Sequence, residues 1–219
     1  EISGKNTTPN KFDREHAEEW PGGRYNHYLF DMNRDWAWQT QIETKQRMAL
    51  YNQWMPHVHT DVHEQGYDSP YFFPPAAEPQ HEFLEAYQKD FHKLLGKNIA
   101  AKFDANNWMY NTSERFDLFY PSYGDTYPMY NGAVGMTLEQ GGIRAGREIT
   151  MENGVNLTIK DRLTHHKPAV LAVVETSASQ VDPLLKGFKN FMNNPRTQMK
   201  GKYATYILKN NPKLNQLAD

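Results

Sequence analysis

The chain has 219 residues, and its 24 Lys and Arg against 26 Asp and Glu give a formal net charge of -2. This length supports one core of good size, and the absence of a basic stripe argues against a nucleic-acid partner. The longest apolar run, Ala169 to Val174, is too short to span a bilayer. With no cysteine in the sequence, disulfides and thiolate ligands are excluded, so any metal must sit on His, Asp or Glu.

The elements expected from the sequence alternate between helices and strands after an aperiodic stretch, residues 1–24, which indicates a loop. The first part of the chain should form a helix over 38–55 ended by Pro56, a strand over 57–64, a proline-containing loop over 65–80 and a helix over 81–95 capped by Gly96. A strand is expected within 132–142, followed by a helix marked by Val155, Ile159 and Leu163 with a kink or restart at Pro168. The last expected elements are a helix over 181–192 and a strand over 203–208. This alternation predicts an α/β layer fold.

The strand expected at 57–64 has the sequence HVHTDVHE. Because alternate side chains of a strand share a face, His57, His59, Asp61 and His63 should all point the same way. A structural strand would place aliphatic residues there, so this composition predicts a polar, metal-binding site. His63 is the best placed, because ligands gather at the carboxyl ends of strands in α/β sheets. Asp61 could orient the imidazole of His59 or His63, or contact a neighbouring basic residue.

Two further segments carry residue types suited to a site. Arg34 can grip a carboxylate with two parallel hydrogen bonds and Asn33 adds a donor, although such a pair also commonly lies on a solvated surface. Glu139 is placed near the end of a strand flanked by glycines. A general base needs that clearance for water and substrate, together with partial burial that raises its pKa. A strand glutamate that faces solvent is the alternative.

Together these segments resemble the zinc carboxypeptidases of the carboxypeptidase A class. That family has an Asp-x-Asn-Arg-Asn/Asp-aromatic box, then an Asp-x-His, a tyrosine-bearing loop and a strand that ends in the catalytic Glu. The matching segments occur here in the same order, as DMNRDW at 31–36, DVH at 61–63, YPSYG at 120–124 and GMTLEQGG at 135–142. The resemblance covers about residues 20–160 and implies a partial mixed β-sheet flanked by helices.

The resemblance implies a role for each matched residue. His63 becomes one zinc ligand and Glu139 the general base, while Asn33 and Arg34 would hold the free C-terminal carboxylate of a peptide. The substrate would be a peptide or the peptide of peptidoglycan. Because peptidases of this family are mostly exported, the resemblance also implies an extracytoplasmic location.

Two roles of the family have competing candidates. Tyr120 would close over the substrate, with Tyr123 as the alternative. The arginine that stabilises the oxyanion should precede the Asn-Arg box, which leaves Arg24 and Arg14, and Arg24 is preferred.

The family's His-x-x-Glu motif, which supplies two of its three protein zinc ligands, should lie well upstream of the Asn-Arg box. A His-x-x-Glu does occur at 16–19, but its Glu19 lies only 14 positions before Asn33. The chain is therefore expected to be a C-terminal piece of a zinc peptidase, inactive by itself and holding zinc weakly or not at all. Residues 1–195 would form the incomplete catalytic domain, and residues 196–219 would begin a following element. A sheet without its first strands has an open edge, which predicts self-association.

Two other interpretations of the sequence stay open. His57 and His59 could form the metal pair of a different metallohydrolase, although its barrel would need more βα repeats than the chain contains. Alternatively, the chain could be a non-catalytic interaction module that keeps a carboxypeptidase-like fold without metal.

Overall fold

The computed structural model describes residues 25–142 and 148–197, together with residues 202, 203, 205, 207, 209 and 210. Arg14, Arg24 and the His-x-x-Glu segment at 16–19 lie outside the described residues, so the roles expected for them stay predictions.

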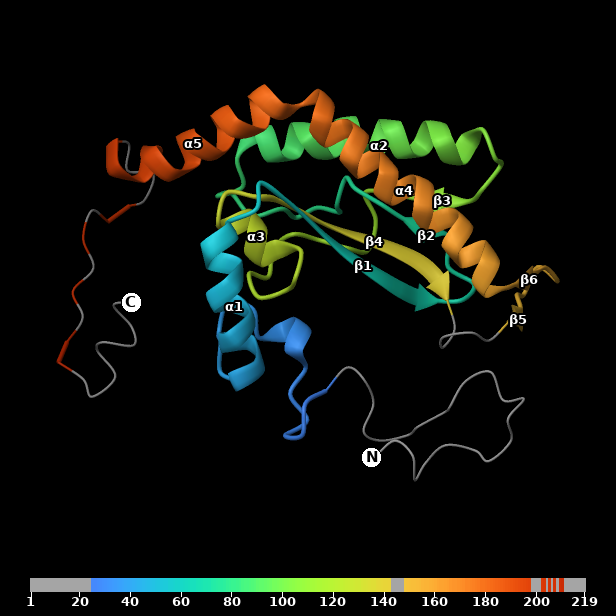
Figure 1. The fold of residues 1–219 in the computed structure, drawn as a ribbon, viewed down its shortest axis with the longest axis horizontal. Coiled ribbons are helices and arrows are strands. Elements are labelled where there is room, and N and C mark those ends of the chain that lie inside the picture. Colours follow the sequence, from blue (N-terminus) through green and yellow to red (C-terminus); the bar gives the residue numbers. More distant parts are fainter. Residues whose placement is uncertain are drawn as a thin grey trace.

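A four-stranded mixed sheet lies at the centre of the described fold, with strand order β1-β4-β2-β3 (Figure 1). β1 (Val58–Gly66) runs parallel to β4 (Val134–Gly142) along their full length. β2 (Tyr71–Phe72) pairs antiparallel with β4 and parallel with β3 (Tyr110–Asn111). The predicted α/β fold, with a mixed sheet flanked by helices, is therefore confirmed, as are the strands expected at 57–64 and within 132–142.

Three long helices cover one face of this sheet. α2 (Ala86–Asp104), α4 (Ile159–Ser179) and α5 (Val181–Thr197) lie together on that side (Figure 1). The layer between them and the sheet is apolar and buried, and its members from β4, α2 and α4 include Val134, Met136, Leu138, Leu95, Ile99, Phe103, Ala169 and Ala172. Removal of this apolar surface from water is the main term that favours the fold.

The opposite face of the sheet carries the polar side chains of β1 and β4. It packs against α1 (Ile42–Trp54), the short 3-10 helix η2 (Met32–Arg34) and α3 (Thr126–Tyr130). Asp125, which precedes α3, accepts a hydrogen bond of 2.8 Å from Thr137 Oγ1 of β4. α1 and α3 meet the sheet near the amino-terminal halves of β1 and β4, and η2 reaches Asp61 and His63, so a polar recess is left beside the later residues of the two strands.

Gly96 does not end the helix expected at 81–95, so that expectation is wrong. Glu85 begins α2 with a capping box that includes Gln88, and the helix continues through Gly96 to Asp104. A Cβ at Gly96 would lie 2.5 Å from the carbonyl oxygen of Pro74. The glycine is therefore needed for close packing against the 74–75 loop, at the cost in helix propensity that an interior glycine carries.

The helix expected around Val155, Ile159 and Leu163 is confirmed for the last two, because α4 begins at Ile159, whereas Val155 precedes it. All three side chains are exposed, and the face that α4 buries includes Ala169 and Ala172. α4 runs through Pro168 without interruption. Preceding it is a small hairpin that was not predicted, formed by β5 (Ile149–Thr150) and β6 (Asn156–Leu157).

The last described elements differ from expectation near the carboxyl terminus. α5, expected at 181–192, extends to Thr197, so the expected domain boundary at 195/196 falls inside it. Tyr203, Thr205 and Ile207 belong to no strand, so the strand expected at 203–208 is wrong for these described members. Within the described residues, no helix is both long enough and apolar enough to cross a membrane.

Candidate functional site

A cavity of about 230 Å³ opens at the carboxyl ends of β1 and β4. The parallel register places His63 directly beside Glu139, so two residues that are 76 positions apart in sequence come together. The side chains around the cavity come from all four segments that were matched by sequence and from the 115–117 turn; they include Asn33, Arg34, His63, Arg115, Tyr123, Asp125, Thr137 and Glu139. The predicted residues Asn33, Arg34, His63 and Glu139 therefore share one cavity.

A hydrogen-bonded network fixes the orientation of His63. Asp61 Oδ2 lies 2.8 Å from His63 Nε2, and Asn33 Nδ2 lies 3.3 Å from both atoms. Because a carboxylate only accepts, Nε2 carries the ring proton, and a neutral ring then has its lone pair on Nδ1. Of the alternatives left open for Asp61, the structure therefore selects contact with His63.

Asn33 is held between the two parts of the site. Its Oδ1 accepts a hydrogen bond of 2.8 Å from the backbone N–H of Gly124, while its Nδ2 donates to Asp61. A Cβ at Gly124 would lie 2.5 Å from Asp61 Oδ2 and 3.0 Å from Asn33 Oδ1. The close approach of the 120–124 loop to η2 and β1 thus requires a glycine at this position. Asn33 acts as an internal brace, with both ends of its amide already used.

Burial and like charges perturb the carboxyl groups of the site. Burial raises the pKa of Glu139 to about 7, with His63 opposing the rise and the negative charges of Asp61 and Asp125 adding to it. Burial also raises the pKa of Asp125 to about 6, against its hydrogen bond from Thr137. Burial alone would raise the pKa of Asp61 as well, but the hydrogen bond and charge of His63 hold it below its usual value.

Glu139 differs from the other two carboxylates in its surroundings. Its side chain is only 9 % exposed, and its Oε2 is buried without a hydrogen-bond partner. A buried carboxyl oxygen that is left unsatisfied is costly, and such groups concentrate where chemistry occurs. Of the two alternatives for this residue, the surface-facing strand glutamate is therefore wrong.

Arg34 provides an exposed cation at the cavity. Its guanidinium lies 4.3 Å from the centre of the Tyr123 ring, a cation–π contact, and its Nη1 donates to the Asn33 carbonyl at 3.0 Å. Tyr123 lines the cavity, whereas Tyr120 is not among the lining residues. The Tyr120 hydroxyl accepts a hydrogen bond of 2.7 Å from Trp38 Nε1, and its ring lies 4.8 Å from that of Tyr123.

Sequence reasoning missed Arg115 and Thr137, which also line the cavity. Thr137 could have been found, because it is two residues before Glu139 and therefore shares its face of the strand. Arg115 lies in the 115–117 turn, where its own backbone has φ of 64°. No residue pattern in the sequence marked it as part of a site. Asp125, which directly follows the matched 120–124 segment, also lines the cavity.

His57 and His59, the other histidines of the strand, are used in ring packing. The His59 ring lies 5.4 Å from Trp36 and 5.9 Å from Tyr51, and burial lowers its pKa. The His57 ring lies 4.4 Å from that of Phe188. Neither histidine lines the cavity, which removes the geometric basis for a His57-x-His59 metal pair.

The donor set decides whether a zinc ion fits the described part of the site. The tautomer fixed by Asp61 suits His63 as a ligand through Nδ1. A catalytic zinc site, however, takes three protein ligands, and no group of three or more His, Cys, Asp or Glu able to hold a metal occurs among the described residues. The described residues therefore supply one ligand of such a site, His63, and do not complete the set of three.

Comparison with known proteins adds no family assignment. No protein-family model, no curated protein and no solved structure matches the chain.

Proposed function

We propose that this chain carries the general-base and substrate-binding part of a zinc carboxypeptidase-type site, which hydrolyses the last peptide bond of a peptide with a free C-terminus. The observation that supports it best is the cavity in which Glu139, with a pKa raised to about 7, lies beside His63, and which the exposed cation Arg34 also lines. His63 would be one ligand of the metal. The remaining ligands would come from residues outside the described part.

Glu139 is the residue proposed to move the proton. A carboxyl group with a pKa of about 7 is about half ionised at neutral pH, which suits a group that must both accept and return a proton. Its carboxylate, which lines the cavity, would accept a proton from the attacking water. The same carboxyl group would then donate that proton to the departing amine.

Arg34 is the residue proposed to select a free C-terminus. Its guanidinium is exposed and oriented by the Tyr123 ring, so it can present two donors to a carboxylate. Asn33 is proposed to position other groups of the site, because its amide holds Asp61 and the 120–124 loop by hydrogen bonds. Tyr123 is better placed than Tyr120 to contact a bound peptide.

The experiment measures release of the terminal residue from a peptide with a free C-terminus and from its amidated counterpart. It uses the full gene product that contains these 219 residues, with its zinc content determined in parallel. The proposal expects hydrolysis of the free peptide, and loss of at least about a hundredfold in kcat in Glu139→Gln with zinc retained. Glu82→Gln, at an exposed position, is the matched control and should keep full activity.

Two outcomes would overturn the proposal. Undiminished turnover in Glu139→Gln would remove Glu139 as the base. A zinc-free and inactive gene product that still binds peptide would instead favour the non-catalytic interaction module.

We also propose that β1 takes part in association between copies. Among the strands of the described residues, β1 is hydrogen-bonded only to β4, so its other edge presents nine residues of backbone. Light scattering should show a mass above that of the 25.5 kDa monomer, and a purely monomeric mass at high concentration would refute this. An extracytoplasmic location, as for most of the family, completes the proposal.

A further inference from the structure

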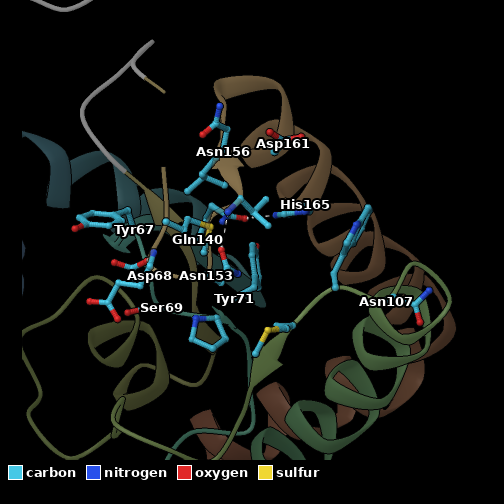
Figure 2. Close-up of a pocket in the computed structure, with 17 residues that line it drawn as sticks. Tyr67, Asp68, Ser69, Tyr71, Asn107, Gln140, Asn153, Asn156, Asp161 and His165 are labelled. Atoms are coloured by element: carbon cyan, nitrogen blue, oxygen red, sulfur yellow. Dashed lines mark hydrogen bonds between the residues drawn. The ribbon is translucent and has the colours of Figure 1, made fainter. Parts of the chain in front are cut away.

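A second and larger cleft, of about 600 Å³, lies behind the sheet from the candidate site. Glu139 and Gln140 are consecutive in β4, so their side chains point to opposite faces, and Gln140 lines this second cleft. Figure 2 shows Gln140 and Tyr71 in the middle of it, with Tyr67 on one side and His165 of α4 on the other. The volume is that of a site for a small organic ligand.

The walls of the cleft are fixed by hydrogen bonds within the protein. Asp68 Oδ1 accepts from the backbone N–H of Glu152 at 2.8 Å, which ties the β5–β6 hairpin to the loop after β1. Gln140 Nε2 donates to the Gly141 carbonyl at 2.8 Å, so its Oε1 faces His165 Nδ1 at 2.9 Å. The cleft is therefore largely formed before any ligand arrives.

His165 is set up as a neutral hydrogen-bond acceptor. Because the amide oxygen of Gln140 can only accept, His165 Nδ1 carries the ring proton and Nε2 carries the lone pair. Burial lowers the pKa of His165, which keeps the ring uncharged at neutral pH. The ring of Trp108 packs against it with 4.6 Å between centroids. An aromatic wall thus stands beside an acceptor for a hydroxyl group.

The charges of the lining exclude several classes of ligand. Among the described residues, Asp68, Glu152 and Asp161 line the cleft and no Lys or Arg does, so these residues would repel phosphate or carboxylate groups. Asp68 is already used in the wall, and Asp161 accepts from Thr158 Oγ1 at 2.6 Å as the cap of α4. Asp68 Oδ1 and Asp161 Oδ2 are therefore already hydrogen-bonded within the fold, which leaves fewer carboxylate oxygens in the described lining to coordinate a cation directly.

The uncharged polar groups of the lining match a ligand rich in hydroxyls. Besides Gln140 they are the amides of Asn107, Asn153 and Asn156 and the hydroxyl of Ser69. Tyr67 and Trp108 add ring surface, against which the C–H face of a sugar ring can pack.

We propose that this cleft binds a neutral saccharide, with Tyr67 and Trp108 as its aromatic walls and His165 Nε2 and the asparagine amides as its hydrogen-bonding groups. The site is separate from the candidate active site, and the proposal does not depend on peptide hydrolysis.

The test is isothermal titration of the 219-residue chain with chitotriose and maltotriose as neutral probes, glucose 6-phosphate as the anionic probe and putrescine as the cationic probe. We expect at least one neutral trisaccharide to bind with a Kd of about 1 mM or tighter, and the other two probes to bind at least about tenfold more weakly. Tyr67→Ala and Trp108→Phe should each weaken trisaccharide binding by about fivefold or more. Trp54→Phe, at a tryptophan that is 80 % exposed and outside the cleft, is the matched control and should leave Kd unchanged.

Each contrary outcome overturns the proposal. These are the absence of trisaccharide binding, tighter binding of putrescine or glucose 6-phosphate, and trisaccharide binding that neither cleft variant weakens. Circular dichroism of each variant confirms that it folds; if Trp108→Phe does not, the half-buried Tyr67 decides alone.

Discussion

Replacement of Glu139 by Gln should stabilise the folded protein at pH 8 and leave its stability unchanged near pH 4. The folded pKa of about 7 lies above the ordinary value of 4.5, so between these two values the folded state binds more protons than the unfolded state. The free energy of unfolding of the wild type must therefore fall as pH rises through this window. A glutamine cannot ionise, so the variant does not undergo this fall in the free energy of unfolding as the pH rises.

The size of this effect follows from the two pKa values. At about 1.4 kcal/mol for each pH unit, the span from 4.5 to about 7 gives a ceiling of about 3 kcal/mol. Glu139 borders a cavity that solvent can enter, and screening there reduces the expected difference to about 2 kcal/mol.

Urea unfolding followed by circular dichroism at pH 4, 6 and 8 measures this difference directly. The advantage of Glu139→Gln over the wild type should grow from near zero at pH 4 to about 2 kcal/mol at pH 8. Glu82→Gln, an exposed control, should show no such growth. A difference that is constant with pH, or a wild type that gains on the variant as pH rises, would refute the burial argument for Glu139.

Three further substitutions test the packing around the site by the same unfolding measurement. Asp61→Asn should lower the free energy of unfolding by about 1–3 kcal/mol at pH 7, because it removes an ionised carboxylate whose pKa is lowered in the folded state. The cost should be clearly smaller at pH 3, because the stabilisation by this carboxylate fades as the pH falls below its ordinary pKa of 3.8. An equal cost at both pH values would contradict the ion-pair argument. Arg162→Met should cost about 2 kcal/mol, because it breaks an ion pair in which the arginine is buried and the Glu64 carboxylate is partly exposed. Adding Glu64→Gln should recover part of the loss, and no recovery would show that the pair itself is unimportant. Gly96→Ala should destabilise the protein by about 1–3 kcal/mol despite the better helix propensity of alanine, because its Cβ would press on the Pro74 carbonyl, and a rise in Tm would show that this contact relaxes at no cost.

Local pattern was enough to find the elements that position the site. The alternation at 57–64 and the glycines around Glu139 identified β1 and β4, because a strand of nine residues leaves a periodic trace. β2 and β3 have only two residues each and leave none, since their pairing depends on where β4 lies. The end of α2 was misplaced for a related reason: the packing of Gly96 on a distant loop outweighed its local tendency to end a helix.

Some features of the site also follow from local sequence, and others depend on contacts between distant segments. Asn33, Arg34, His63 and Glu139 could be selected because each lies in a short segment whose residue types suit one task. The sequence favoured Tyr120 over Tyr123, but both belong to one loop, and only the path of that loop decides which ring meets Arg34. The bracing role of Asn33 depends on Gly124, 91 positions away, and no local pattern reports such a contact.

The carboxyl ends of β1 and β4 are held from both faces of the sheet. On the cavity side Asp61 and Asn33 fix His63, as described above. On the other side Arg162 of α4 donates to Glu64 at 2.6 Å and 2.9 Å, and Gly142 is needed because a Cβ there would contact the Glu64 carboxylate.

Since His63 and Glu64 are consecutive in β1, the Glu64–Arg162 ion pair fixes the backbone that carries His63, just as the contact between His165 and Gln140 fixes the backbone that carries Glu139. α4 thus positions both residues of the candidate site without touching the cavity. A change in α4 at Arg162 or His165 should therefore disturb the side-chain orientations of His63 and Glu139 while the pairing of β1 with β4 persists, because the ladder between these strands is continuous along all nine paired positions.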